Sequence, residues 1–214
     1  MRVGILGSGI VGRTLGGGFA ENGHDVRLGT RTPGKPELVQ WAASAGGTAT
    51  VGTFAEAARH GELVVLSCLG DASSEVLGLA DPANLEGKTL IDTTNPLDFS
   101  KGMPPGIFVG LNDSLGERHQ RQLPHSRVVK CFNIVPAPIM VRPSILTAPP
   151  TMMIAGNDAS AKATVASLLK EFGWEPPVDL GGIENARWLE TLVPLWVRVA
   201  SALGNFNVAF RAVT

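Results

Sequence analysis

A glycine-rich turn near the start of the chain constrains the fold more than any other segment. Residues 7 to 12 read Gly-Ser-Gly-Ile-Val-Gly, and the apolar segment from Arg2 to Leu6 runs directly into them. A predicted helix from Val11 to Asn22 follows. A buried strand, a G-x-G-x-x-G turn and a helix in this order are typical of a dinucleotide-binding unit. The alternative is a glycine turn that binds nothing.

Each glycine of this turn has a separate purpose in such a unit. The first permits the tight turn, the second lets the backbone approach a pyrophosphate, and the third lets the helix lie close to the sheet. The helix N-terminus then offers unpaired N–H groups and a positive dipole end to the phosphates. The residues that we predict to hold the dinucleotide here are Gly7, Ser8, Gly9, Ile10, Val11 and Gly12.

The residues after the second predicted strand, at positions 24 to 29, distinguish between the two nicotinamide cofactors. An NAD site carries an acidic residue about 20 positions past the glycines. This chain carries Thr30 and Arg31 there, followed by Lys35. A carboxylate would repel a 2′-phosphate, whereas arginine pairs with it. These residues predict NADP(H) binding, and a solvated basic loop is the alternative.

Strands and helices alternate along the rest of the chain, which predicts an α/β fold with a Rossmann-type doubly wound parallel sheet and a small C-terminal α/β appendage. Further strands are predicted at residues 48–51, 63–66, 88–92, 127–130, 151–155 and 175–180. Prolines between positions 136 and 150 mark a long linker. We therefore predict an NADP-binding Rossmann domain at residues 1–145 and a small substrate-side and dimerisation segment at 146–214. Residues 98–112 are expected to form an irregular loop.

Ligands of doubly wound sheets bind beyond the carboxyl ends of the strands. By this rule the predicted cofactor site also contains Ser67, Cys68, Leu69, Asn95 and Pro96. The next strand ends at Asn133 and Ile134, which are predicted to lie on the substrate side.

The same rule leaves no well-placed proton donor. Three histidines precede strands, at the opposite edge of the sheet, and the fourth lies in a predicted helix; they are His24, His60, His125 and His119. Lys101 and Lys130 are the nearest alternatives, and a structural or phosphate-side role is favoured for Lys130. We therefore predict hydride transfer by apposition of two rings, with no catalytic side chain and no metal.

The composition argues against several classes of protein. Hydrophobic residues make up 44% of the chain and the net charge is −1, so there is no basic field to attract nucleic acid or an anionic membrane. No apolar run approaches the roughly 20 residues of a membrane helix. The chain begins with a strand and no signal peptide, and Cys68 and Cys131 lie far apart. We expect a cytoplasmic protein with reduced thiols.

The sequence resembles the NADP oxidoreductases dependent on coenzyme F420, which move hydride between NADP(H) and a deazaflavin. The similarity rests on the glycine turn, Thr30-Arg31, residues 130 to 133 (Lys-Cys-Phe-Asn) and residues 185 to 195 (Asn-Ala-Arg-Trp-Leu-Glu-Thr-Leu-Val-Pro-Leu). The resemblance implies that Arg187 and Thr191 face the deazaflavin and that Asn133 lies near its ring. The archaeal enzymes carry histidine in place of Asn133 and threonine in place of Val193.

Three functions stay open from the sequence. The first is hydride exchange between NADP(H) and coenzyme F420 or a flavin as co-substrate, because related ferric reductase domains pass hydride to a flavin. The second is a carbonyl or imine reductase of the β-hydroxyacid dehydrogenase type, although only about 65 residues follow the linker. Such relatives carry a long helical second domain. The third is a redox sensor that binds NADPH without turnover.

The predicted helix from Gly182 to Gly204 is apolar on most sides and contains Pro194. Such a helix must be buried on most faces, and the short C-terminal segment offers little to cover it. We therefore predict a homodimer.

Overall fold

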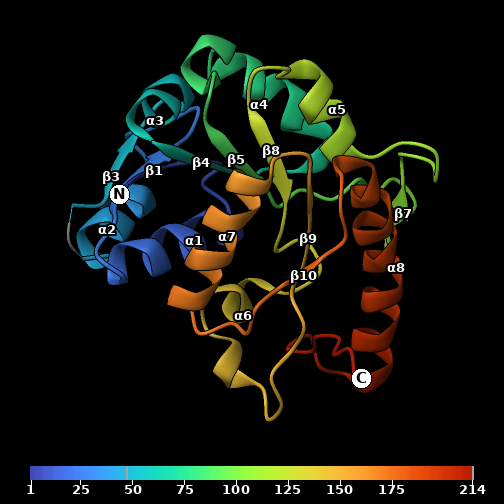
Figure 1. The fold of residues 1–214 in the computed structure, drawn as a ribbon. Helices are drawn as coiled ribbons and strands as arrows, with labels where there is room; N and C mark the ends of the chain where they lie inside the picture. Colours follow the sequence, from blue (N-terminus) through green and yellow to red (C-terminus); the bar gives the residue numbers. More distant parts are fainter. Residues whose placement is uncertain (47, 214) are drawn as a thin grey trace.

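The computed structural model describes residues 1–46 and 48–213, and in this part of the chain eight strands form one sheet (Figure 1). Their order is β10-β9-β8-β5-β4-β1-β2-β3. The strands are β1 (Arg2–Leu6), β2 (Asp25–Gly29), β3 (Thr50–Gly52), β4 (Leu63–Leu66), β5 (Thr89–Asp92), β8 (Arg127–Lys130), β9 (Met153–Gly156) and β10 (Val178–Asp179). The order β3-β2-β1-β4-β5-β8 is that of a Rossmann-type sheet, so the predicted fold class is confirmed.

Helices cover both faces of this sheet (Figure 1). They are α1 (Ile10–Glu21), α2 (Pro36–Ser44), α3 (Phe54–His60), α4 (Ser73–Leu79), α5 (Leu115–Gln122), α6 (Ala137–Val141), α7 (Ala159–Glu171) and α8 (Ala186–Leu203). Helices α1, α6 and α7 lie on one side, and α3, α4 and α5 lie on the other. Two of them begin at side-chain caps: Thr53 and Glu56 form a capping box at the start of α3, and Asp158 accepts from Ala161 N at the start of α7.

The strands bury both faces because their side chains alternate between two hydrophobic cores. In β5, Leu90 belongs to the core beneath α3 and α4, whereas Ile91 belongs to the core beneath α1, α6 and α7. Val128 and Val129 divide between the same two cores in β8. A strand buried on both faces reads as a continuous apolar run, which explains why these strands were easy to predict.

The structure corrects three details of the predicted architecture. Strand β9 runs antiparallel to β8. A parallel neighbour would need a crossover that returns the chain to the far end of the sheet. The proline-rich segment between these strands does not make that return. It also contains α6, where we expected only a linker. The loop at residues 98–112 includes part of a short antiparallel hairpin, β6 (Leu97–Asp98) with β7 (Gly106–Ile107).

The segment after residue 145 extends the sheet of the N-terminal part through β9 and β10. The division at residues 145 and 146 stays a prediction, and Thr214 lies outside the described residues. In the described part of the chain, no helix is long and apolar enough to cross a membrane.

Candidate functional site

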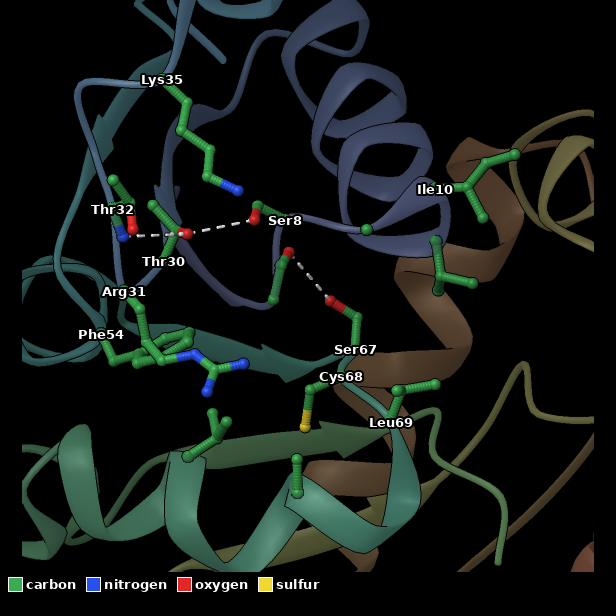
Figure 2. A pocket seen from close by; sticks show the side chains of 15 residues that line it. Ser8, Ile10, Thr30, Arg31, Thr32, Lys35, Phe54, Ser67, Cys68 and Leu69 are labelled. Atoms are coloured by element: carbon green, nitrogen blue, oxygen red, sulfur yellow. Dashed lines mark hydrogen bonds between the residues drawn. The ribbon is translucent and has the colours of Figure 1, made fainter. Parts of the chain in front are cut away.

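A cleft of about 600 Å³ opens at the carboxyl ends of β1, β2 and β4 (Figure 2). This edge is the topological switch point, where the strand order reverses on either side of β1. The cleft is lined by Gly7, Ser8, Gly9, Ile10, Val11, Thr30, Arg31, Thr32, Lys35, Phe54, Ser67, Cys68, Leu69, Ala72 and Val76. Most of the residues predicted to bind the cofactor therefore come together here.

The glycine turn has the geometry that its sequence indicates. Gly7 has a φ of 135°, a conformation that side chains strongly disfavour. A Cβ added at Gly12 would lie 1.9 Å from the carbonyl oxygen of Gly7, so a larger residue there would push the helix away from the turn. Gly12 supports the cleft without lining it. At Gly9 a Cβ would meet nothing within 4 Å, because that position faces the open cleft.

The N-terminus of α1 is available to an anion. Gly9 is its N-cap and provides no side-chain hydrogen bond, and the first turn contains no acidic residue. The first N–H groups of a helix lack partners within the helix, and the helix dipole places positive charge beside them. This end of the cleft therefore suits a pyrophosphate.

The opposite end of the cleft is basic. In Figure 2 the guanidinium of Arg31 extends beside Phe54 into the cleft, and the ammonium of Lys35 points toward Ser8 and Thr30. Ser8 donates a hydrogen bond from its hydroxyl to Thr30 Oγ1 at 3.1 Å, which ties the glycine turn to the end of β2. Among the described residues, no carboxylate lines this cleft.

Sequence reasoning missed four residues of this lining. They are Thr32, Phe54, Ala72 and Val76. Phe54 follows the end of β3, so the strand-end rule could have found it. Ala72 and Val76 come from the turn and helix after β4, where only packing between α3 and α4 brings them to the cleft.

A second pocket of about 230 Å³ adjoins the first at the tips of β4 and β5. The two pockets share Val11, Ser67, Cys68 and Leu69. Burial raises the pKa of the Cys68 thiol to about 12, with a smaller contribution from Asp92. The thiol is therefore neutral and forms an apolar part of the wall between the pockets.

The second pocket differs from the prediction in one respect. Asn95 lines it together with Thr93 and Thr94, as the strand-end rule requires, but so do Asp71 and Phe99. The strand-end rule did not predict Asp71, which comes from the turn after β4. Pro96 lines neither pocket, although Asn95 before it does.

The predicted substrate-side residues at the end of β8 lie in the interior. Asn133 Nδ2 donates to Asn95 Oδ1 at 2.9 Å and to Leu189 O at 3.0 Å. Asn95 Nδ2 in turn donates to Asn133 O at 2.9 Å. Asn133 Oδ1 is buried without a hydrogen-bond partner in the described part of the chain. Ile134 is buried in the core beside α1. Asn133 lines neither pocket and is linked to the second one through its hydrogen bonds with Asn95.

Arg187 and Thr191 lie on α8, outside the lining of both pockets. Arg187 donates to both carboxylate oxygens of Glu117 on α5, at 2.8 and 2.6 Å. These hydrogen bonds lower the pKa of Glu117. Thr191 Oγ1 donates to Arg187 O at 2.8 Å. Their predicted contact with the second coenzyme stays a prediction, and Arg187 would have to leave Glu117 to make it.

Three of the four histidines lie away from the cleft. His24 bonds Glu171 and His60 bonds Asp25, both at the amino-terminal edge of the sheet. His125 precedes β8 at the same edge. His119, in α5, lies instead beside the end of β5. It is buried and its Nδ1 lies 2.9 Å from Asp92 Oδ2, so its imidazole is not open to either pocket.

Lys130 is completely buried, as is Asp92. Burial alone would lower the pKa of Lys130, but the carboxylates of Asp92 and Glu190 outweigh it and the pKa is raised. Burial likewise opposes ionisation of Asp92, yet Lys130 and His119 hold the pKa of Asp92 well below its usual range. No group of three or more histidine, cysteine or acidic side chains in the described residues could hold a metal ion.

Known proteins that are similar to this chain include NADP-dependent reductases. The model of a family described as "NADP oxidoreductase coenzyme F420-dependent" matches residues 2–96. The chain is 41% identical to a candidate F420-dependent NADP-reductase from Arthrobacter sp. FB24; the alignment covers 100% of both chains, with a TM-score of 0.96.

Two curated relatives are longer than this chain. The chain is 32% identical to the F420-dependent NADP reductase of Methanothermobacter marburgensis over 69% of its own length and 66% of that protein. It is 30% identical to the rat metalloreductase STEAP3 over 96% of its own length, but it spans only 40% of that protein.

Proposed function

The chain belongs to the NADP oxidoreductase family dependent on coenzyme F420, and we propose that it transfers a hydride between NADP(H) and a deazaflavin coenzyme of the F420 type or a flavin. The observation that carries the proposal is the junction of the two pockets at Val11, Ser67, Cys68 and Leu69. The larger pocket suits the phosphates and adenosine of NADP(H), and the smaller one suits two rings in contact.

The charge of the larger cleft supports NADP(H) as the dinucleotide. Arg31 and Lys35 line the end beyond β2, where the 2′-phosphate of the adenosine would lie. Arginine pairs with phosphate through a fork of donors. The N-terminus of α1 would hold the pyrophosphate, because its first N–H groups have no side-chain cap.

The smaller pocket supports direct transfer between rings. Thr93, Thr94 and Asn95 form a wall whose side chains are already hydrogen-bonded within the protein, while Leu69 and Phe99 offer exposed apolar surface. The two coenzymes supply the redox chemistry, and the protein orients them. Hydride would leave NADPH for ring atom 5 of the acceptor, a carbon in a deazaflavin and a nitrogen in a flavin, and solvent would supply the proton that completes reduction of the ring. In this scheme Asn133, Ile134, Arg187 and Thr191 serve the acceptor side.

Asp71 favours a second candidate, a carbonyl or imine reductase. That reaction needs a proton donor near the substrate, and Asp71 is the acidic side chain in the described lining of the smaller pocket. Removal of a general acid typically slows turnover by about 10²–10⁴-fold. Direct transfer between rings should instead tolerate Asp71→Asn within a few-fold.

An acceptor panel separates these functions. NADPH oxidation should be followed with coenzyme F420, FMN, FAD and riboflavin, and in parallel with simple ketones and cyclic imines. We expect turnover with F420 or a flavin, unchanged within a few-fold in Asp71→Asn. Turnover with ketones or imines alone, lost in Asp71→Asn, would show that the reductase alternative is correct. Tight NADPH binding without any acceptor would indicate a sensor.

A further inference from the structure

We propose that Lys130 is a positioning residue that fixes the ring end of the cleft through the backbone of Thr94. The inference rests on the proposed function in one respect, because it takes the smaller pocket as the place of the nicotinamide ring. Lys130 touches neither pocket, and its effect is exerted through the residues after β5.

The ammonium of Lys130 connects three elements. Its Nζ donates to Thr94 O at 2.6 Å and to Asp92 Oδ2 at 3.1 Å, and it forms an ion pair with Glu190 Oε1 at 2.7 Å. Asp92 ends β5 and Glu190 belongs to α8. The ammonium is thus bonded to the residues at the end of β5 and paired in charge with α8.

Thr94 is held from a second side by the same cluster. Asp92 Oδ1 accepts from Thr94 N at 2.9 Å and from Thr94 Oγ1 at 2.7 Å. The backbone N–H, the backbone carbonyl and the hydroxyl of Thr94 are therefore all tied to Asp92 or Lys130. Because Thr94 and Asn95 line the smaller pocket, this cluster determines where the wall of that pocket lies.

Glu190 links the cluster to the rest of the molecule. Its carboxylate accepts from the backbone N–H groups of Leu115 and Gly116, at 2.9 and 3.0 Å, and so holds the start of α5. The buried Lys130 thereby joins β5, β8, α5 and α8, which lie together in Figure 1. A buried charge that lost its partners would be strongly unfavourable, so these distances are tightly constrained.

The residues after Lys130 are also held in an uncommon conformation. Phe132 has a φ of 65°, which is rare for a bulky side chain. This backbone places Asn133 where its amide pairs with Asn95, directly after Thr94. Strained backbone next to a buried ionic cluster occurs where structure over-determines a functional segment. Both features act on the same two residues of the smaller pocket.

The test compares two ligands that differ in the nicotinamide end. NADPH would occupy both pockets, whereas 2′,5′-ADP carries the adenosine and 2′-phosphate and would occupy the larger one alone. In Lys130→Met we expect the dissociation constant of NADPH to rise about ten-fold and that of 2′,5′-ADP to stay within about two-fold. Both constants can be measured by calorimetry without any hydride acceptor.

A matched lysine serves as the control. Lys88 precedes β5 at its amino end, and its Nζ donates to Ala58 O at 2.8 Å. It thus also holds a backbone carbonyl, but at the edge opposite the cleft. Lys88→Met should leave both dissociation constants unchanged. A loss of thermal stability in either variant, without the change in ligand discrimination, would indicate a purely structural role for that lysine.

A second comparison covers the case in which Lys130→Met does not fold. The double variant Lys130→Met with Glu190→Gln removes one positive and one negative charge from the cluster, so its net charge is kept while Thr94 O still loses its donor. Against Glu190→Gln alone, the double variant should show the same selective loss of NADPH affinity. Equal weakening of both ligands, or of neither, would overturn the proposal. Failure of the proposed function would appear separately, as wild-type protein that binds NADPH and reduces no deazaflavin or flavin.

Discussion

At the scale of single residues, the charge at the end of β2 decides which dinucleotide the cleft prefers. Arg31 and Lys35 are exposed side chains in its described lining, and none of that lining is acidic. Charge-assisted hydrogen bonds to phosphate contribute about 1.5–3 kcal/mol each. The NADP(H) preference therefore depends on very few side chains.

Arg31→Ala should weaken NADPH binding about ten-fold or more and leave NADH binding nearly unchanged, because only NADPH carries the 2′-phosphate. Arg27→Ala is a suitable control. Arg27 lies in β2, just before the segment that carries Arg31, and its guanidinium is bonded to Thr50 Oγ1 at 3.2 Å. Equal dissociation constants of the wild-type protein for NADPH and NADH would contradict the prediction.

At the scale of elements, α1 combines tight packing with an open N-terminus. A Cβ at Gly16 would meet the Trp41 ring at 2.9 Å, and one at Gly18 would meet Val141 at 2.5 Å. These two glycines permit close packing of α1 against α2 and α6. Gly17 does not, because a Cβ there would meet nothing within 4 Å. Glycine at an open helical position costs stability without a packing benefit.

Gly9→Ala and Gly17→Ala should separate binding from stability. Both added methyl groups would be free of contacts in the protein, but the one at Gly9 would occupy the place of a pyrophosphate. Gly17→Ala should raise the free energy of unfolding by roughly 1 kcal/mol and leave NADPH affinity unchanged. Gly9→Ala should retain its melting temperature and lose NADPH affinity. Unimpaired NADPH binding by Gly9→Ala would mean that the turn does not hold the phosphates.

The buried end of β5 makes stability depend on pH. The pKa of Asp92 is lowered in the folded protein from its ordinary value of 3.8. A carboxylate with a lowered folded pKa contributes stability that is fully present above the unfolded value and is lost as the pH falls through the folded one. The contribution of Asp92 should therefore decline only below about pH 3.8.

Asp92→Asn should lower the free energy of unfolding by about 3–5 kcal/mol at neutral pH, because it leaves the buried ammonium of Lys130 with one fewer counter-charge. The difference from the wild-type protein should narrow when urea unfolding is repeated at about pH 3. Asp98 is half-buried and accepts a local hydrogen bond from Ser100 N, so Asp98→Asn serves as a control and should change neutral-pH stability little. A difference that stays constant at acidic pH would show that Asp92 does not ionise as described.

At the scale of the whole molecule, α8 presents an apolar face that the chain does not cover fully. Val193 and Val197 pack into the core on its inner face. On its outer face, Trp188 is 60% exposed and Leu195 is 54% exposed. The C-terminal tail covers part of the helix, because Trp196 Nε1 donates to Val208 O at 2.8 Å. The rest of this outer face is available to a second copy.

We propose that the protein is a homodimer that pairs through the outer face of α8. Light scattering at micromolar concentration should give twice the mass of one chain. Leu195→Glu should yield monomers, since a charge would enter the interface, while Leu79→Glu on α4 should not. Leu79 is a fair control because it is also exposed, at 47%. A wild-type monomer at physiological salt would count against the proposal.

The sequence alone determined the features whose physical cause is local. The glycine turn, the caps at Thr53 and Asp158 and the apolar strands depend on residues a few positions apart, so their pattern predicts them. The strand-end rule then placed Ser67, Cys68 and Asn95 at one edge, because the carboxyl ends of parallel strands meet there. The Rossmann-type fold and most of the cleft lining followed from these two kinds of information.

Only the tertiary structure decided the pairings between distant segments. Arg187 on α8 binds Glu117 on α5, 70 positions away. Glu190 binds Lys130, and His119 reaches Asp92 from α5. The entry of Asp71 into the smaller pocket and the antiparallel direction of β9 have the same origin. These contacts depend on how whole helices and connections pack against the sheet, and no short stretch of sequence carries that information.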